Sequence, residues 1–283
     1  RSLSGPLSIW NDHTDTMMVR DAGWIHVFAE NGQEAYDHTF WSFRVAEDAG
    51  VMLPVALNLD GFIMTHMIEP VEFEDDALIK KYLPEYKMKG ALHPDNPVSM
   101  GCFAMPEMYT ETQMAREQAL LNSYPTCLKA WDEWAALTGR RYHPIETYRA
   151  DDADYCIVTM GSFGETAMEA VDALRAQGEK VGLIKIRLWR PFPFDDFAQA
   201  AAGKKTLIVM DRAISFGGPG GPVALELRSA LYKKTGAPKI VNYVAGLAGR
   251  DVAVNDFKQI ILEGKAKAKK GDTEGYTLYG LRA

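Results

Sequence analysis

The sequence predicts an α/β protein built from two domains. The chain has 283 residues, close to twice the roughly 150 residues of an average domain. Its second half alternates strand-sized apolar runs with helical patterns, which is typical of a mostly parallel sheet with helices on both faces. Hydrophobic residues make up 47% of the chain and charged residues 24%, an ordinary globular composition. A chain of this size can build its core without disulfide bonds.

Charge and composition exclude several classes of protein. The net charge of −7 argues against a nucleic-acid-binding protein, which would normally carry a basic surface. No apolar run reaches the length of a membrane-spanning helix, and no signal peptide is recognisable. The three cysteines are far apart and form no CxxC pair, which excludes an iron–sulfur cluster or zinc site held by this chain alone. So few cysteines fit a reducing cytoplasm.

The first residues read as the middle of a domain. Arg1 is followed at once by an apolar segment, with no helix or strand leading up to it. We therefore expect a further N-terminal portion to precede this sequence. The alternative is a processed chain that starts at Arg1.

A helix is predicted after Asn31. Asn31 and Glu34 have the spacing of a capping box, and the helical pattern continues to about Asp48. The face that we expect toward the core carries aromatic residues at helical spacing, namely Tyr36, Phe40 and Phe43. Residues 51–57 then read as a buried strand, and Pro54 places that strand at a sheet edge or bulge because proline cannot donate to the ladder.

Residues 69–110 are predicted to be irregular. Several prolines interrupt any long element there, and a long loop-rich stretch usually wraps a neighbour or covers a site. Residues 111–138 return to a helical pattern. A polar linker follows, and we divide the chain into a domain of residues 1–148 and a domain of residues 149–283.

The second domain has the clearest pattern. The expected elements, in order, are a strand at 155–160, a helix to 177, strands at 181–188 and 206–210, a helix at 222–233, a strand at 239–244 and a helix at 254–262. Lys265 to Lys270 then read as a solvated basic tail. The first strand, helix and strand form a right-handed βαβ unit.

Two glycine-rich turns are candidate ligand loops. In residues 161–164, Ser162 and Glu165 have capping-box spacing, and the free amides could hold a phosphate. We favour a plain strand–helix turn, because the GxGxxG pattern is missing. Residues 215–222 contain four glycines but lack the lysine of a phosphate loop, so contact with another chain is the favoured reading.

A polar cluster follows the first apolar segment. Asn11, Asp12, His13 and Asp15 lie within five residues, and they either orient a substrate or form a polar turn. No histidine pair has metal-ligand spacing, and no nucleophile motif is present. Composition and spacing thus predict a fold but no reaction.

Several motifs, in order along nearly the whole chain, resemble the alpha chain of pyruvate:ferredoxin oxidoreductases and related 2-oxoacid:ferredoxin oxidoreductases of the multi-subunit type. They lie at residues 6–13, 15, 17–20, 23–24, 29–31, 33–35, 60–62, 65–66, 190–193 and 245–251. The resemblance implies a pyrimidine-binding-type thiamine domain, incomplete here, followed by a transketolase C-terminal-like α/β domain.

The resemblance also implies an activity. Such enzymes decarboxylate a 2-oxoacid with thiamine diphosphate, transfer the acyl group to coenzyme A and pass electrons through [4Fe–4S] clusters to ferredoxin. The diphosphate and its Mg²⁺ are expected on a beta chain, and the clusters on beta and delta chains, within a complex that also has a gamma-type chain. Pyruvate is the default substrate. Branched-chain oxoacids, 2-oxoglutarate, oxalate and phenylglyoxylate stay open.

The resemblance assigns few site residues. Arg1 corresponds to the residue that contacts the substrate carboxylate, which suits a planar guanidinium. The catalytic glutamate and a substrate-contacting threonine of the family would lie before Arg1, so no complete catalytic set is expected in this chain. Asn11, Asp12 and His13 form the expected site loop, where single-chain relatives read Phe-Gly-Asp-His.

Pocket walls and assembly complete the expectations. Trp10, Phe62 and Met64 are expected to wall a dry pocket or, more conservatively, to pack in a core. The aromatic first third and residues 69–110 predict a large obligate interface, and a chain that is inactive alone. A transketolase-type enzyme without iron–sulfur partners and a non-catalytic scaffold subunit are the competing functions.

Overall fold

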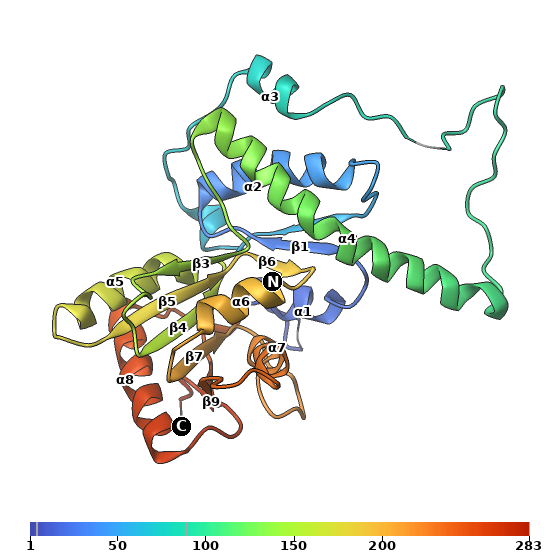
Figure 1. The fold of residues 1–283 in the computed structure, drawn as a ribbon. Helices are drawn as coiled ribbons and strands as arrows, with labels where there is room; N and C mark the ends of the chain where they lie inside the picture. Colours follow the sequence, from blue (N-terminus) through green and yellow to red (C-terminus); the bar gives the residue numbers. More distant parts are fainter. Residues whose placement is uncertain (4, 89, 283) are drawn as a thin grey trace.

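The computed structural model describes residues 1–3, 5–88 and 90–282. They form a three-stranded sheet and a six-stranded sheet, with helices packed on both (Figure 1). The smaller sheet has the order β2-β1-β6 and consists of β1 (Ile25–Phe28), β2 (Val55–Asn58) and β6 (Leu188–Arg190). In it β1 is parallel to β2 and antiparallel to β6. β2 lies at the sheet edge, as predicted from Pro54. It begins only at Val55 and is partly buried, so the predicted buried strand over 51–57 is wrong in its start and in its burial.

Helices α2 (Gly32–Ala46) and α4 (Pro106–Thr138) cover the smaller sheet. Their contact is built on Trp41 and Trp131, whose rings stack with centroids 4.7 Å apart. Asn31 caps α2 as predicted, because its side chain accepts the Glu34 amide. Two short elements, α1 (Thr14–Val19) and the 3-10 turn η1 (Met64–His66), flank the sheet.

The predicted buried face of α2 is wrong. Phe43 is 53% exposed, and the buried face consists of Glu34, Asp37, His38, Trp41 and Val45. Three of these are polar, and most of their polar atoms have partners: Asp37 accepts hydrogen bonds from Arg140 and Tyr142, whereas Nε2 of His38 has none among the described residues. The hydrophobic pattern points to the wrong side because partnered polar groups take the core positions.

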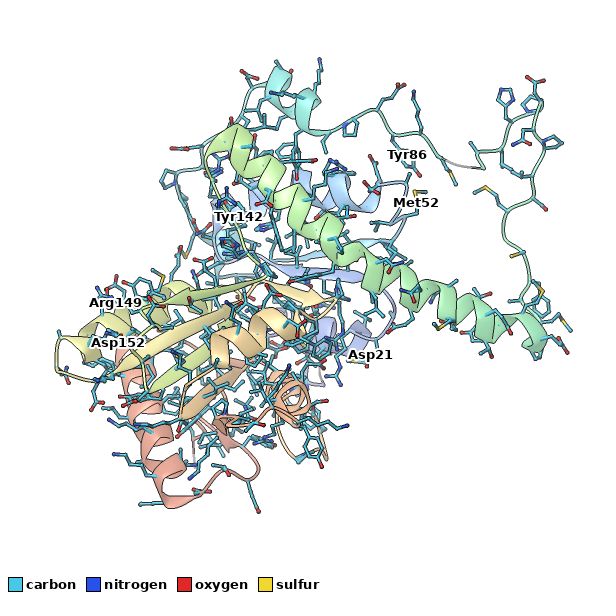
Figure 2. The ribbon with its side chains drawn as sticks, in the orientation of Figure 1. Asp21, Met52, Tyr86, Tyr142, Arg149 and Asp152 are labelled. Atoms are coloured by element: carbon cyan, nitrogen blue, oxygen red, sulfur yellow. The ribbon has the colours of Figure 1, made fainter. Side chains whose placement is uncertain are left out.

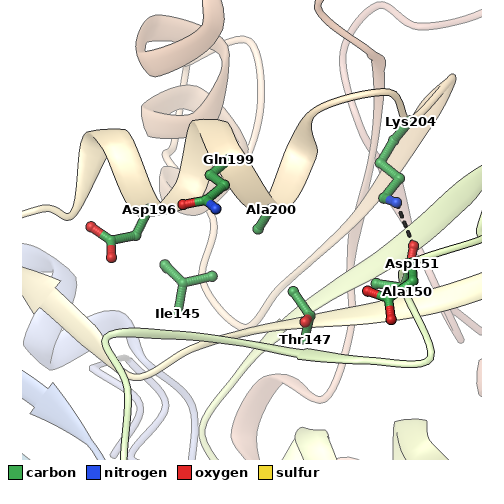
Figure 3. Close-up of a pocket in the computed structure, with 8 residues that line it drawn as sticks. All are labelled: Ile145, Thr147, Ala150, Asp151, Asp196, Gln199, Ala200 and Lys204. Atoms are coloured by element: carbon green, nitrogen blue, oxygen red, sulfur yellow. Dashed lines mark hydrogen bonds between the residues drawn. The ribbon is translucent and has the colours of Figure 1, made fainter.

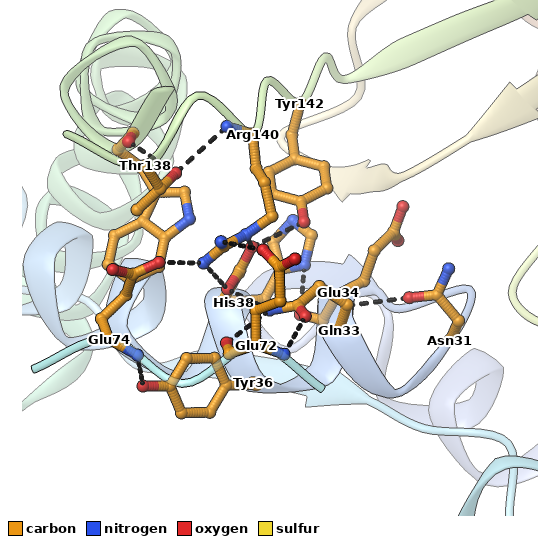
Figure 4. Close-up of polar contacts among 12 residues, drawn as sticks. Asn31, Gln33, Glu34, Tyr36, His38, Glu72, Glu74, Thr138, Arg140 and Tyr142 are labelled. Carbon is orange, nitrogen blue, oxygen red and sulfur yellow. Dashed lines mark hydrogen bonds and ion pairs between the residues drawn. The ribbon is translucent and has the colours of Figure 1, made fainter. Parts of the chain in front are cut away.

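Residues 69–82 pack on the chain itself. Arg140 pairs with Asp37 of α2 and with Glu72 and Glu74 of this segment (Figure 4). Helix α3 (Asp76–Tyr82) ends the segment, and the Tyr82 hydroxyl donates to the Ala130 carbonyl at 3.0 Å. This first third of the predicted interface segment therefore has its partner within the chain.

The next residues leave the body of the molecule. The chain runs outward after α3 and returns along the first turns of α4 (Figure 1). We call residues 84–88 and 90–118 the arm, and Figure 2 shows its side chains, Tyr86 among them, in the open. Its exposed large apolar residues are Tyr86, Met88, Leu92, Val98, Met100, Phe103, Met105, Met108, Tyr109 and Met114.

The larger sheet has the order β3-β5-β4-β7-β8-β9. Its strands are β3 (Ile145–Tyr148), β4 (Tyr155–Met160), β5 (Val181–Ile186), β7 (Thr206–Asp211), β8 (Lys239–Val244) and β9 (Thr277–Leu278). All pair in parallel except β3, which is antiparallel to β5. Helices α5 (Phe163–Arg175) and α8 (Val254–Lys270) pack on one face, and α6 (Phe194–Ala201) and α7 (Pro222–Leu231) on the other. The parallel, doubly covered sheet is thus confirmed.

One predicted boundary in this half is wrong. Lys265 to Lys270 belong to α8 and are not a solvated tail, because alanine and lysine are good helix formers and extend the helix. The division at residue 148 stays a proposal. β3 lies before it and joins the larger sheet, while β6 lies after it and joins the smaller one.

Candidate functional site

The larger sheet has a switch point at β4. From β4 the chain moves to β5 on one side and later to β7 on the other. In open α/β sheets the crevice at the carboxyl ends of two such strands is the usual place for a ligand. Ser162 follows β4, and Arg212 follows β7. In this chain the crevice receives a carboxylate from the first half, that of Asp60.

Asp60 is buried, with 3% of its surface exposed. Its side-chain partners come from segments that are far from it in the sequence. Its Oδ1 lies 3.0 Å from His13 Nε2, and its Oδ2 accepts from Arg212 Nη1 at 2.7 Å. The Ser162 amide and hydroxyl also donate to Oδ2, at 2.7 and 2.5 Å. Burial alone would raise the pKa of Asp60, but His13, Arg212 and these donors hold it well below its usual range. We call Asp60, His13, Ser162 and Arg212 the latch.

The contacts of the latch show that the predicted capping box of Ser162 is wrong, and they argue against a phosphate at residues 161–164. Ser162 does not form a capping box with Glu165, because the Ser162 hydroxyl donates to Asp60 and the Glu165 carboxylate accepts from the Asn31 side chain. The turn amide that a phosphate would need is also bonded to Asp60. A phosphate at this turn would have to displace a buried carboxylate.

The three residues predicted for the site loop lie together. Asn11, Asp12 and His13 are at most 5% exposed. The His13 amide donates to the Arg212 carbonyl at 2.9 Å, and the Asp12 carboxylate accepts the amides of Thr14 and Ala248. The Asn11 carbonyl accepts the Gly249 amide at 2.5 Å. The loop is therefore held by the second half of the chain, over residues 246–249.

Arg1 lies apart from the latch. Its side chain is 57% exposed. Within the described part of the chain its guanidinium has no partner. The neighbouring Ser2 amide donates to the Trp10 carbonyl at 3.0 Å, so Arg1 adjoins the start of the site loop.

An exposed row of rings borders the same loop. Trp10 is 50% exposed and Phe62 38%, so neither packs in a core. Their ring centroids lie 5.7 Å apart, and the His66 ring stacks on Phe62 at 4.3 Å. We call Trp10, Phe62 and His66 the aromatic shelf. Met64, the third expected pocket wall, lies within η1 and is partly buried.

Sequence reasoning missed four of these residues. Asp60 enters only through the resemblance at residues 60–62, and Arg212 has no motif of its own. Ser162 reads as a helix cap, and His66 enters only through the resemblance at residues 65–66. An aspartate two residues after an apolar strand is the signal that could have marked Asp60.

The pocket in Figure 3 has no connection with the latch. It measures about 300 Å³ and lies between β3 and α6. Its Lys204 is already bonded to the Ala150 carbonyl, so the pocket offers no free cation. Its other polar lining residues are Thr147, Asp151, Asp196 and Gln199.

The described residues form neither a cluster of metal ligands nor a membrane-spanning helix. In residues 1–3, 5–88 and 90–282, no group of three or more histidine, cysteine or acidic side chains could hold a metal ion. No helix in this part of the protein is both long enough and apolar enough to cross a membrane.

Two family models match the chain. Residues 1–128 match the model for pyruvate flavodoxin/ferredoxin oxidoreductase, thiamine diphosphate-binding, and residues 153–257 match core domain II of pyruvate:ferredoxin oxidoreductase. A solved structure of 2-oxoglutarate:ferredoxin oxidoreductase from Magnetococcus marinus, with 2-oxoglutarate, coenzyme A and succinyl-CoA bound, shares the fold. Its TM-score is 0.59 at 17% identity, over 93% of this chain and 47% of that one.

Curated relatives are similar over most of the chain. Pyruvate synthase subunit PorA of Thermotoga maritima is 42% identical over 89% of this chain, and PorA of Pyrococcus abyssi is 39% identical over 97%. Ketoisovalerate oxidoreductase subunit VorA of Pyrococcus furiosus is 36% identical over 97%. The chain spans 64% of the Thermotoga protein and 69% of each Pyrococcus protein.

Proposed function

Because the chain belongs to the pyruvate:ferredoxin oxidoreductase family, we propose that it is the alpha subunit of a thiamine diphosphate-dependent 2-oxoacid:ferredoxin oxidoreductase. The reaction converts a 2-oxoacid and coenzyme A to acyl-CoA and CO₂. Two electrons leave, one to each of two ferredoxins. The single observation that carries this proposal is the similarity to PorA proteins along 89 to 97% of the chain.

Pyruvate is the proposed substrate. PorA proteins at 39 to 42% identity favour it over the oxoacid of the VorA relative, at 36%. The margin is small, so a branched-chain 2-oxoacid is the second candidate.

The described residues fit the ring portion of thiamine diphosphate better than its diphosphate. The exposed aromatic shelf offers flat apolar faces, whereas the described chain holds no group of metal ligands for Mg²⁺. The amide of Ser162, at the start of α5, is already bonded to Asp60. We therefore place Trp10 and Phe62 against the rings, and the diphosphate and Mg²⁺ on a beta-type partner. When bound, the cofactor supplies the electron sink for decarboxylation.

Arg1 is the proposed anchor of the substrate carboxylate. Its exposed guanidinium is available for a bidentate contact, which a planar guanidinium makes best. Asn11, Asp12 and His13 then position this surface and do not react themselves, since all three are buried.

The arm supports a place in a complex. A monomer in water would leave its ten large apolar side chains exposed, and patches of this extent mark interfaces. We propose that the arm binds other subunits of the complex, the beta, gamma and delta types, in an obligate interface that buries more than about 2,000 Å². A scaffold subunit without substrate contacts is the competing function.

The test compares the chain alone with the assembled complex. The chain should give no 2-oxoacid-dependent reduction of a viologen dye, even with thiamine diphosphate and Mg²⁺. The complex, with coenzyme A, should reduce ferredoxin fastest with pyruvate when pyruvate, 2-oxoisovalerate and 2-oxoglutarate are compared. Turnover by the chain alone, or a complex without oxoacid activity, contradicts the proposal.

A further inference from the structure

We propose that His66 donates a hydrogen bond, through Nε2–H, to the substrate oxygen that gains negative charge in the reaction. The inference rests on the proposed function, which makes the substrate a 2-oxoacid. It assigns a role to a residue that the latch and Arg1 leave unexplained.

The turn that carries His66 is strained. Phe62 has φ of 62°, in the left-handed region that an aromatic residue seldom adopts. Such a conformation persists only where the surroundings hold it, and it is concentrated at functional sites. Here the Phe62 amide donates to Thr65 Oγ1 at 2.9 Å, and the Met64 amide donates to the Asp60 carbonyl at 2.9 Å.

The same hydroxyl orients the imidazole. Thr65 Oγ1 lies 2.9 Å from His66 Nδ1. In the proposed arrangement Thr65 Oγ1, which accepts the Phe62 amide, gives its own proton to Nδ1, and the neutral ring then carries its proton on Nε2. Among the described residues Nε2 has no partner, and His66 is exposed. The donor is therefore available to a ligand.

Two residues of the aromatic shelf, Trp10 and Phe62, adjoin buried residues in the sequence. Phe62 follows Asp60 by two residues, and Trp10 directly precedes the buried Asn11. The His66 ring is nearly parallel to Phe62, with an angle of 11° between the planes. A donor held in place before the reaction begins stabilises developing charge without reorganising.

The other histidines near this surface are unsuitable. His13 is bonded to Asp60. The His26 and His38 rings are shielded from any ligand, being at most 1% exposed. His66 is the exposed imidazole of the aromatic shelf, and Trp10 at the other end of the shelf is bonded to Ser2, the neighbour of Arg1.

The first experiment needs no activity. ¹⁵N-histidine NMR of the full chain, with His66 assigned by its loss in His66→Gln, should show the Nε2–H form. Thr65→Val should remove that preference, because Nδ1 loses its donor. An Nδ1–H form in the wild-type chain, or no change in Thr65→Val, overturns the inference.

The second experiment uses the assembled complex. His66→Phe keeps the stacked ring and loses the donor, so kcat and kcat/KM for the 2-oxoacid should fall together, on the order of a hundredfold. His66→Gln retains an N–H near the Nε2 position and should lose less. His143→Gln, at an exposed histidine of the linker, is the matched control and should match the wild type.

The outcomes separate the two proposals. A His66→Phe complex within about twofold of the wild type, or one with a raised KM and unchanged kcat, overturns the His66 role while the function stands. A wild-type complex without 2-oxoacid activity overturns both. Size-exclusion chromatography confirms assembly of each variant, and His66→Gln decides if His66→Phe does not assemble.

Discussion

At the scale of single residues, the buried Asp60 joins the two halves of the chain. One carboxylate bonds to His13 from its own half of the chain and to Ser162 and Arg212 from the other. Arg212 is 2% exposed and lies over the Phe163 ring at 4.1 Å. An arginine so buried depends on its counter-charge.

Asp60→Asn should therefore destabilise the protein. The change leaves Arg212 charged and unpaired, which typically costs about 3–5 kcal/mol. Urea unfolding followed by tryptophan fluorescence measures the loss. Asp21→Asn, at a side chain 76% exposed, is the control and should stay within about 0.5 kcal/mol.

The same substitution has a pH signature. The folded pKa of Asp60 is lowered, so its stabilisation is present above the unfolded value, about 4, and lost as the pH falls below it. The difference between wild type and Asp60→Asn should narrow below about pH 4. A difference that stays constant there contradicts the ionised latch.

Arg1→Lys tests the substrate anchor. Lysine keeps the charge but loses the planar fork, so kcat/KM for the 2-oxoacid should fall about ten- to a hundredfold. The KM for coenzyme A should not change. Asp12→Asn should lose less, because asparagine keeps one acceptor for the amides of Thr14 and Ala248. Unchanged kcat/KM in Arg1→Lys would remove Arg1 from the site.

At the scale of elements, the turn between β4 and α5 has little freedom. Gly161 has φ of 70°, and a Cβ there would lie 2.8 Å from Asp60 Oδ2. Gly178, after α5, also has positive φ, at 87°, but a Cβ there would meet nothing within 4 Å. Alanine at either glycine would strain the backbone, but only alanine at Gly161 would also contact Asp60. Comparing the two substitutions therefore distinguishes these two costs.

Gly161→Ala should cost more than Gly178→Ala. The left-handed conformation costs either alanine about 1–2 kcal/mol, and Gly161→Ala adds about 1–3 kcal/mol for the disturbed Asp60 hydrogen bonds. Unfolding free energies of the two variants give the comparison. Equal losses would mean that the turn can shift away from Asp60.

The elements also show what a sequence pattern can predict. β4 and β8 occupy their predicted residues, because each is an apolar run with turn residues on both sides. β1 was missed, since it has four residues with His26 inside.

Of the site, residues 11–13 were predicted as a local cluster. Asp60, Ser162 and Arg212 were not, because they meet only after both sheets have formed.

At the scale of the whole molecule, the arm is the part that the body does not stabilise. It projects from the smaller sheet (Figure 1), and Phe103 in it is 83% exposed. Residues 69–82 already pack on α2. The interface expected over 69–110 is therefore limited to the residues of the arm. An interface through the arm itself stays a prediction.

Limited proteolysis tests that interface. Chymotrypsin should cut the isolated chain first within the arm, near Tyr86 and Phe103, and the assembled complex should be protected there. Tyr232 is 84% exposed, outside the arm, and gives a reference cleavage rate in both samples. Equal cleavage of the arm in chain and complex would show that it binds no partner subunit.

The exchange of strands between the two sheets has a consequence for biosynthesis. β1 ends at residue 28, whereas β6, which closes its free edge, ends at residue 190. A ribosome adding about 5–20 residues per second needs on the order of ten to thirty seconds to cover that distance. During this interval β1 presents an unpaired edge to other nascent chains. The smaller sheet therefore cannot be completed until residues 188–190 have been translated.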